Sequence, residues 1–294
     1  MAETDELFTL RSLYWIGNYQ GAINEANGLH KVKPNLKDEK DEYVYRSFIG
    51  LGQYNIVLSE VSDSSSTPIG KRAIKLLAFY LNNPQNNKDA VFQQLKEWLS
   101  DPVAGQNKTL VLIAATIYLH EDNHKDAYRI LKEGNGLEQT AFLVQLHLKI
   151  HRNDLAQKQL AKLKTIDEDS VLTMLCTAWI HMSNSKFQDA GYIFEELIDK
   201  YGSTSTLLNS LAVSKMQSGN FDEAEINLQE ALTKNNGDAD SLANIIIVSQ
   251  HLHRSEEVIN RYFSQLRLKA PNHPLITSLD NFSAAFDRVA ATIN

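Results

Sequence analysis

Residues 207–232 read LLNSLAVSKMQSGNFDEAEINLQEAL, and this stretch predicts two helices joined by a tight turn. Apolar residues continue as far as Met216, where Ser218-Gly219-Asn220 interrupts them. After the interruption they return with the spacing of one helical face, at Phe221, Ala224, Leu228, Ala231 and Leu232. A helical hairpin is therefore the unit from which we expect the fold to be built.

The hairpin resembles the tetratricopeptide repeat, a pair of helices about 34 residues long. The positions that define that repeat are held here by Leu208, Leu211, Ala212, Gly219, Phe221, Ala224 and Ala231. The proline that usually closes the repeat is absent, and Asn236-Gly237-Asp238 supplies a turn instead. Paired helices approach closely at the small residue of the second helix, here Ala224, and we name the residue at this position the anchor.

Anchors recur along the sequence at intervals of roughly 34 residues. They are Ala22, Val57, Ala90, Ala127, Ala156, Ala190, Ala224 and Val258. We therefore predict an all-α fold, a right-handed superhelical solenoid of about eight tetratricopeptide-like helical hairpins with a C-terminal capping helix. We expect residues 1–294 to form a single domain, with weaker repeats over 1–165, better-formed repeats over 166–272 and the capping helix over 273–294.

The composition is that of a globular protein with an acidic balance. The 294 residues include 29 Lys or Arg and 36 Asp or Glu, which gives a formal net charge of -7. Such a surface repels phosphate groups, so we expect no nucleic-acid binding. The longest apolar run, Leu110 to Leu119, is half the length that spans a bilayer, so we expect no direct membrane insertion either. Cys176 is the only cysteine, and the N-terminal residues lack the basic and apolar regions of a signal peptide. A cytoplasmic protein is the expectation.

Residues 120–124 read HEDNH and match H-E-x-x-H, the signature of zinc peptidases. That chemistry needs both histidines on one helical face. Counted from the anchors, however, the string falls in the turn between two helices, with Asp122 at the place that Gly219 holds in the later repeat. We interpret His147 and His151 of the fifth hairpin as surface or helix-terminal residues. We therefore expect no metal site, no catalytic residue and no cofactor.

The first helices of stacked hairpins line a concave inner wall. Counting from the anchors predicts that a partner binds to a wall made of Arg11, Tyr14, Arg46, Ile49, Phe79, Leu112, Leu119, Leu148, Leu175, Trp179, Met182, Val213, Met216 and Ile247. The later part of this wall is apolar, as protein interfaces are. The earlier part mixes cations with aromatic residues, which suits an acidic or extended segment. The alternative is a tight superhelix in which these residues pack on one another.

Longer strings resemble one family in particular. They are LFTLRSLYWIGNYQGAIN near the start, then AIKLLAFYL, LKEWLSDP, DLAQKQL with the following IDED, GYIFEELIDKYGST and NFDEAEINLQEAL, and finally NRYFSQLRLKAPNHPLI. Together they are similar to the epsilon subunits of coatomer, the coat of COPI vesicles. The resemblance runs in order over nearly the whole sequence, so it is more specific than the repeat pattern alone.

The resemblance implies a structural, non-enzymatic coat subunit that binds the C-terminal domain of the coatomer alpha subunit, which also associates with the beta-prime subunit. It implies a role in retrograde Golgi-to-endoplasmic-reticulum transport and in transport within the Golgi. The protein would then lie on the cytoplasmic side of Golgi membranes and COPI-coated vesicles. The alternative is a chaperone adaptor that binds C-terminal peptides. Such adaptors use several inward Lys, Arg and Asn residues together, whereas here these residues are scattered among apolar ones.

Overall fold

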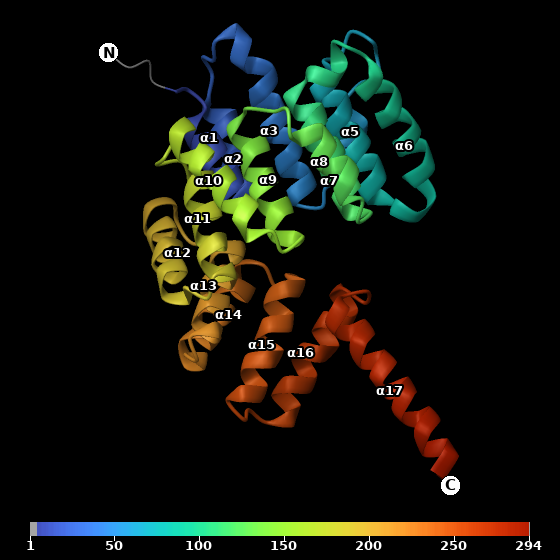
Figure 1. The fold of residues 1–294 in the computed structure, drawn as a ribbon, viewed down its shortest axis with the longest axis vertical. Helices are drawn as coiled ribbons and strands as arrows, with labels where there is room; N and C mark the ends of the chain where they lie inside the picture. The colour runs from blue at the N-terminus through green and yellow to red at the C-terminus, as the bar shows by residue number, and fades with distance from the viewer. Residues whose placement is uncertain (1–4, 294) are drawn as a thin grey trace. The chain divides into compact units, whose positions relative to one another are not determined.

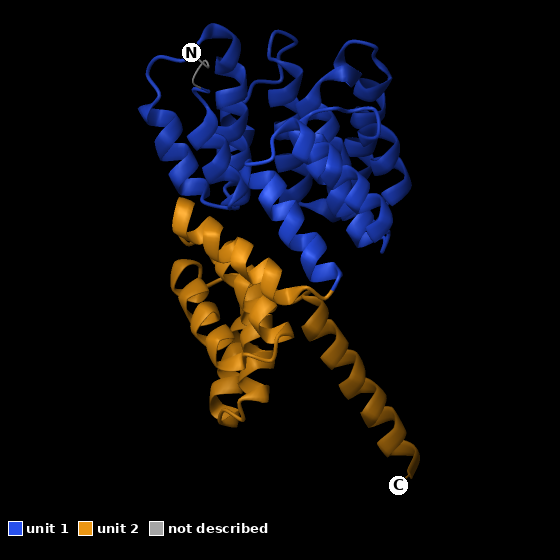
Figure 2. Cartoon of the chain, turned by 60° about the vertical axis from the view of Figure 1, so that its left-hand side comes forward, with its two compact units in different colours: residues 1–184 blue, residues 185–294 orange. Residues whose placement is uncertain are grey.

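Every regular element in the computed structural model is helical over residues 5–293, the part of the chain that it describes (Figure 1). This range holds 17 α-helices and no strands, which confirms the predicted all-α class. The helices form two compact units, residues 1–184 and residues 185–294 (Figure 2). Each unit is described by itself below, and a single solenoid domain over the whole chain stays a prediction.

Unit 1 consists of alternating first and second helices of the predicted hairpins. The first helices are α1 (Phe8–Trp15), α3 (Lys37–Gly50), α5 (Ile69–Asn82), α7 (Lys108–His120), α9 (Leu137–Lys149) and α11 (Val171–Ser183). The second helices are α2 (Tyr19–Gly28), α4 (Tyr54–Glu60), α6 (Pro84–Ser100), α8 (His124–Leu131) and α10 (Asn153–Ile166). Short 3-10 helices cover Pro34–Leu36 and Ala104–Gln106 in the connections.

A residue with a positive φ angle separates the two helices of every predicted hairpin except the third. It stands five positions before the anchor, and the residues concerned are Gly17, Gly52, Asp122, His151, Ser185, Gly219 and His253. Within residues 5–293, all the non-glycine residues with a positive φ occupy this position. A left-handed residue ends one helix and redirects the chain into the next, so the backbone repeats even where the sequence lacks glycine.

The third hairpin is different because Pro84 begins α6 directly after Asn83. The Asn83 side chain accepts a hydrogen bond from the backbone N–H of Asn86 at 3.3 Å and caps the helix. Proline fixes its own φ near -65°, so no left-handed turn forms there. The prediction of Ala90 as the third anchor is wrong, since Ala90 is exposed and Val91 and Leu95 are buried in its place.

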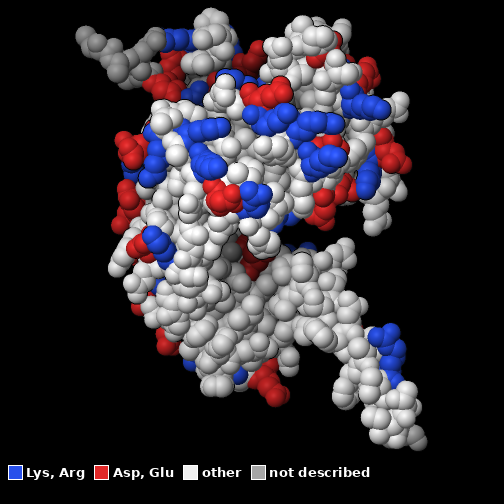
Figure 3. Space-filling view, in the orientation of Figure 1, with Lys and Arg blue, Asp and Glu red and all other residues white. Residues whose placement is uncertain are grey.

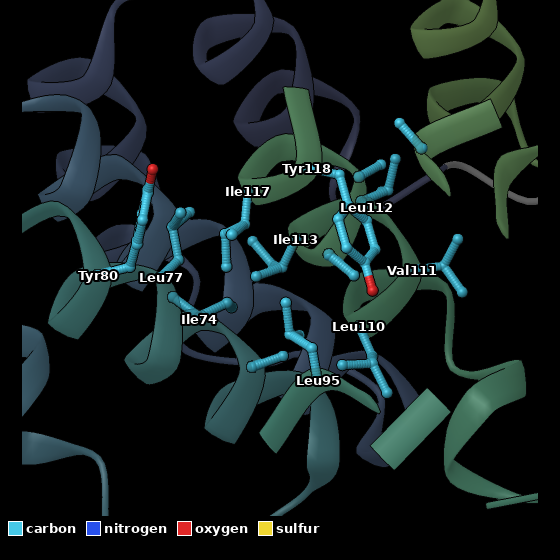
Figure 4. Packing of buried hydrophobic residues seen from close by; sticks show 14 of the residues in the cluster. Ile74, Leu77, Tyr80, Leu95, Leu110, Val111, Leu112, Ile113, Ile117 and Tyr118 are labelled. Carbon is cyan, nitrogen blue, oxygen red and sulfur yellow. The ribbon is translucent and has the colours of Figure 1, made fainter. Parts of the chain in front are cut away.

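The other anchors lie where the pattern places them. Ala22, Val57, Ala127 and Ala156 in unit 1, and Ala190 and Ala224 in unit 2, are all 0% exposed. Val258 is half-buried. The largest apolar cluster lies in unit 1, where Ile74 and Leu77 of α5 and Leu95 of α6 face Leu110 and Ile117 of α7 (Figure 4). Close packing at the six fully buried anchors therefore holds their second helices against the neighbouring helices.

The first helices of unit 1 form a closed ring. Each packs on the next, in the order α1, α3, α5, α7, α9 and α11, and α11 returns to contact α1. A simple solenoid has contacts between neighbouring repeats only. The contact between α11 and α1 therefore shows that unit 1 curves tightly enough to meet itself.

Unit 2 is a consecutive stack of α12 (Phe187–Tyr201), α13 (Ser205–Gln217), α14 (Phe221–Lys234), α15 (Ala239–His251) and α16 (Glu256–Lys269), followed by α17 (Pro274–Ile293). The predicted C-terminal helix is thus present. Its Leu275 and Ile276 pack into the cluster formed by α15 and α16. Phe282 and Phe286 further along are each 73% exposed, and Figure 2 shows the rest of α17 extending away from the other helices of unit 2. No helix within residues 5–293 combines the length and apolar character needed to cross a bilayer.

Candidate partner-binding site

A cavity of about 360 Å³, partly open to solvent, lies inside the ring of first helices of unit 1. Residues of the predicted wall line it, namely Tyr14, Arg46, Ile49, Leu112, Leu175 and Trp179. These side chains come from α1, α3, α7 and α11, so the fold brings residues from both ends of unit 1 to one site. We name this cavity the inner cavity.

Most of the remaining lining is also apolar. Tyr19, Leu77, Leu81 and Phe142 contribute to it, and none of them was part of the predicted wall. Gln145 of α9 is an exposed polar residue of the lining. A hollow of this size with aromatic and aliphatic walls suits apolar side chains of a bound segment.

A polar cluster at the edge of the inner cavity joins α1, α3 and α9. The Glu138 carboxylate of α9 accepts two hydrogen bonds from the Arg46 guanidinium of α3, at 2.9 and 3.0 Å. It also accepts one from the indole N–H of Trp15 of α1 at 2.8 Å. Glu138 lies in the first turn of α9, where the helix dipole favours a negative charge. One carboxylate therefore joins three of the first helices, α1, α3 and α9.

The ion pair between Arg46 and Glu138 is largely buried. The side chains of Arg46 and Glu138 are 14% and 20% exposed. The Arg46 guanidinium also lies over the rings of Tyr14 and Tyr43, with 4.5 and 5.0 Å from its central carbon to the ring centroids. Burial by itself raises the pKa of Glu138, but the charge of Arg46 and the hydrogen bonds from Arg46 and Trp15 outweigh it and lower that pKa below 4.5. The carboxylate is therefore ionised at neutral pH.

A second hollow of about 260 Å³ adjoins the first and shares Trp15, Leu112 and Glu138 with it. Arg11 of the predicted wall lines this hollow. Its guanidinium pairs with Asp5 at 2.5 Å and with Glu39 at 2.7 Å. Both wall arginines therefore already have carboxylate partners, and neither presents a free positive charge to a ligand.

The other predicted wall residues lie elsewhere. Phe79 faces away from the inner cavity, because α5 turns Leu77 and Leu81 toward it instead. Leu119 and Leu148 are half-buried and pack against the apolar clusters of unit 1, and Met182 is half-buried near the end of α11. In unit 2, Val213 and Ile247 are half-buried, while Met216 packs against a core cluster.

The displacement of Phe79 has a local cause. Its place in the wall was counted from Ala90, and the direct passage from α5 into α6 at Asn83-Pro84 breaks that count. Sequence reasoning also missed Glu138, because an acidic residue at the start of a helix is already explained by the helix dipole. No local pattern pairs it with Arg46 or Trp15.

The HEDNH string lies across a turn, as the anchors predict. His120 is the last residue of α7, His124 is the first residue of α8, and Asp122 between them has a φ of 53°. The His120 ring packs edge-on to Tyr80, with 6.1 Å between centroids. Nowhere in the described range do three or more His, Cys, Asp or Glu side chains gather as metal ligands would. Burial raises the pKa of the Cys176 thiol to about 12, so it stays protonated.

Comparisons with known proteins agree with this architecture. The chain is similar to the structure of the Cut9–Hcn1 hetero-tetramer of the APC/C, with a TM-score of 0.64 at 17% identity over 93% of this chain and 54% of that one. It is also similar to a tetratricopeptide repeat protein from Parabacteroides merdae, with a TM-score of 0.61 at 14% identity over 89% of this chain and 96% of that one. These likenesses support the tetratricopeptide-like solenoid fold.

Sequence comparison identifies the family. The family model described as "Coatomer epsilon subunit" matches residues 3–294. Coatomer subunit epsilon-1 of Arabidopsis thaliana is 41% identical over 99% of this chain and 99% of its own length. Coatomer subunit epsilon of Dictyostelium discoideum is 35% identical over 96% of this chain and 97% of its own length. The chain therefore belongs to the coatomer epsilon subunit family, whose members are structural subunits of the COPI coat and not enzymes.

Proposed function

We propose that this chain binds the C-terminal domain of the coatomer alpha subunit through the inner cavity of unit 1. The observation that carries the proposal is the ring of first helices around an apolar hollow, with wall residues from both ends of unit 1 facing it. A protruding segment of the alpha subunit would place apolar side chains against Ile49, Leu175 and Trp179. Burial of such side chains is the main favourable term in protein association.

In this proposal the chain supports retrograde Golgi-to-endoplasmic-reticulum transport and transport within the Golgi as part of the coat. It works from the cytoplasmic face, on Golgi membranes and COPI-coated vesicles, and its contact with the alpha subunit places it beside the beta-prime subunit. The bound segment stabilises this chain in return, since a ligand that binds only the folded state shifts the folding equilibrium.

A chaperone adaptor is the competing function, and it is disfavoured because the arginines near the cavity are already paired with carboxylates. Capture of a C-terminal carboxylate needs cations that are free to bind it. Arg46 is engaged by Glu138, and Arg11 is engaged by Asp5 and Glu39. A C-terminal peptide would have to displace these carboxylates before it could bind.

Co-expression with a C-terminal fragment of the alpha subunit, followed by gel filtration, tests the proposal. We expect the two chains to elute together. Gln145→Trp fills the cavity from an exposed position and is expected to weaken the complex about tenfold or more, since a bulky ring excludes the bound segment. Trp179→Ala is expected to weaken it as well, through loss of an aromatic contact.

Gln157→Trp on α10 is the matched control, because Gln157 is exposed and lies outside the cavity lining. It should bind the fragment as the wild type does. Failure of the wild-type chain to elute with the fragment would reject the alpha subunit as partner. Unchanged binding by both Gln145→Trp and Trp179→Ala would reject the inner cavity as the site while leaving the family assignment intact.

A further inference from the structure

A separate pocket lies between α4, α5 and α6 of unit 1, with a volume of about 400 Å³. Its lining includes Leu58 of α4, Arg72, Lys75, Leu76 and Phe79 of α5, and Trp98 of α6. We name it the Trp98 pocket. It shares no residue with the lining of the inner cavity. Whatever binds here need not be the segment proposed for the ring.

One face of α5 contributes both cations of this pocket and two of its apolar residues. Arg72, Lys75, Leu76 and Phe79 recur at the spacing that places helical residues above one another. The face therefore presents two cations beside an apolar strip, and Phe79 at its end is 40% exposed. An exposed aromatic ring next to cations is a common feature of peptide-binding surfaces.

Arg72 differs from many other cations of this surface because it lies on an aromatic ring and not beside a carboxylate. Basic and acidic side chains are interspersed over the face of unit 1 visible in Figure 3, and many cations of the chain pair with a carboxylate. Arg72 instead lies over the Trp98 ring, 4.9 Å from its centroid, and no ion pair involves it within residues 5–293. Stacking engages one flat face of the guanidinium and leaves N–H groups at its edge for a carboxylate.

Lys75 shows that the pocket can hold a carboxylate. Its ammonium group lies 2.7 Å from the Asp63 carboxylate of the loop after α4. The Asp63 side chain is 84% exposed, so this pair adds little to stability and a competing carboxylate can replace it. The loop residue thus occupies the position that an acidic ligand residue would take.

We propose that the Trp98 pocket binds an acidic peptide segment that carries an apolar residue. One carboxylate of the segment pairs with Arg72, a second displaces Asp63 from Lys75, and the apolar side chain packs against Leu58, Leu76 and Phe79. A nucleic acid does not fit this pocket, because two cations in a chain of net charge -7 cannot neutralise a run of phosphates. The volume is in the range of pockets that take a few side chains.

Fluorescence polarisation with the full chain tests the proposal. The probe is a fluorescein-labelled Gly-Ser peptide with alternating Asp and Leu residues. Two matched peptides replace its Asp residues with Asn or its Leu residues with Gly. We expect the acidic-apolar peptide to bind at low ionic strength and to weaken as salt is added, and both matched peptides to bind about tenfold more weakly or worse.

Variants of the chain test whether the peptide binds in the Trp98 pocket. Arg72→Gln and Phe79→Ser should each reduce affinity for the acidic-apolar peptide about tenfold. Lys96→Gln, an exposed lysine of α6 outside the pocket, should leave it unchanged. Circular dichroism confirms that the variants are folded, and co-elution with the alpha-subunit fragment should persist in Arg72→Gln.

Three outcomes would overturn the proposal. One is that the wild type fails to bind the acidic-apolar peptide at low ionic strength. Another is that the Asn-substituted peptide binds equally well. The third is that Arg72→Gln binds like the wild type while Gln145→Trp loses the peptide, which would place the peptide in the inner cavity.

Discussion

The two compact units use the same hairpin but connect their first helices in different ways. In unit 2, polar contacts join near neighbours, such as the 2.9 Å hydrogen bond from Asn244 of α15 to Asn209 of α13. In unit 1, Glu138 of α9 joins Arg46 of α3 and Trp15 of α1. The repeat pattern thus sets local pairing in both units. In unit 1, a few side chains outside that pattern also join first helices that are far apart in the sequence.

Among the variants that test this difference between the units, removal of Glu138 should lower the stability of the chain most. Glu138→Ala leaves Arg46 buried without a carboxylate and removes the acceptor of Trp15, so we expect the free energy of unfolding to fall by about 3 kcal/mol. Urea denaturation followed by circular dichroism measures the loss. Glu133→Ala is the control, because the Glu133 side chain is 83% exposed.

A companion variant tests whether unit 1 needs the two charges or only a filled position between α3 and α9. Arg46→Met combined with Glu138→Leu replaces the pair by apolar residues and should recover the loss that comes from the unpaired Arg46 charge, but not the loss of the Trp15 acceptor. Equal stability of Glu138→Ala and Glu133→Ala would show that the polar cluster does not hold unit 1 together.

The same cluster predicts a pH dependence of stability. The pKa of folded Glu138 is lowered below its ordinary value of 4.5, so the unfolded chain takes up the proton at a higher pH than the folded chain. The contribution of Glu138 is therefore complete above pH 4.5 and is lost as the pH falls through the lower, folded pKa. The stability difference between wild type and Glu138→Gln should be largest at neutral pH and shrink in acid. A difference that stays constant would contradict the assignment.

Enlarging the anchors should affect both units alike. Ala156→Leu in unit 1 and Ala224→Leu in unit 2 insert bulk where the helices approach closely, and each should cost about 1–3 kcal/mol of unfolding free energy. Ala90→Leu is the matched control, because Ala90 is exposed in the irregular third hairpin, and it should change stability little. Thermal unfolding of the three variants compares them directly. A large loss in Ala90→Leu would mean that this residue is an anchor after all.

The turns should give the smallest effects. Gly219→Ala forces a side chain into a φ of 82°, although no atom lies within 4 Å of the added carbon, so we expect a loss of about 1 kcal/mol from backbone strain alone. Ser185→Gly relieves that strain at a φ of 59° and should gain up to about 1 kcal/mol. Gly28→Ala, at a helical glycine with equal open space, should stabilise instead. Melting temperatures would show these signs, and a loss in Ser185→Gly would reject the shared turn geometry.

The sequence predicts hairpins well because their signals are local. Anchors, turns and helical spacing all lie within one repeat, and the positive φ at Asp122, His151 and His253 shows that the phase holds even without glycine. The third hairpin departs from the pattern at Asn83-Pro84. For the same reason Phe79 lies outside the inner cavity and not in the wall where the pattern predicted it. Closure of the ring could not be predicted, since α1 and α11, like Trp15 and Glu138, are far apart in the chain and match no motif that pairs them.

The closed ring also bears on the speed of assembly. A segment that passes through the ring is surrounded by the first helices of unit 1, and the contacts of Glu138 with Trp15 and Arg46 hold α9 to α1 and α3. Such a segment enters and leaves by threading through the ring or by a transient parting of these helices. Association would accordingly be slower than docking on an open surface, and the residence time of a captured segment longer. Loosening Glu138 would shorten both times even if the equilibrium affinity changed little.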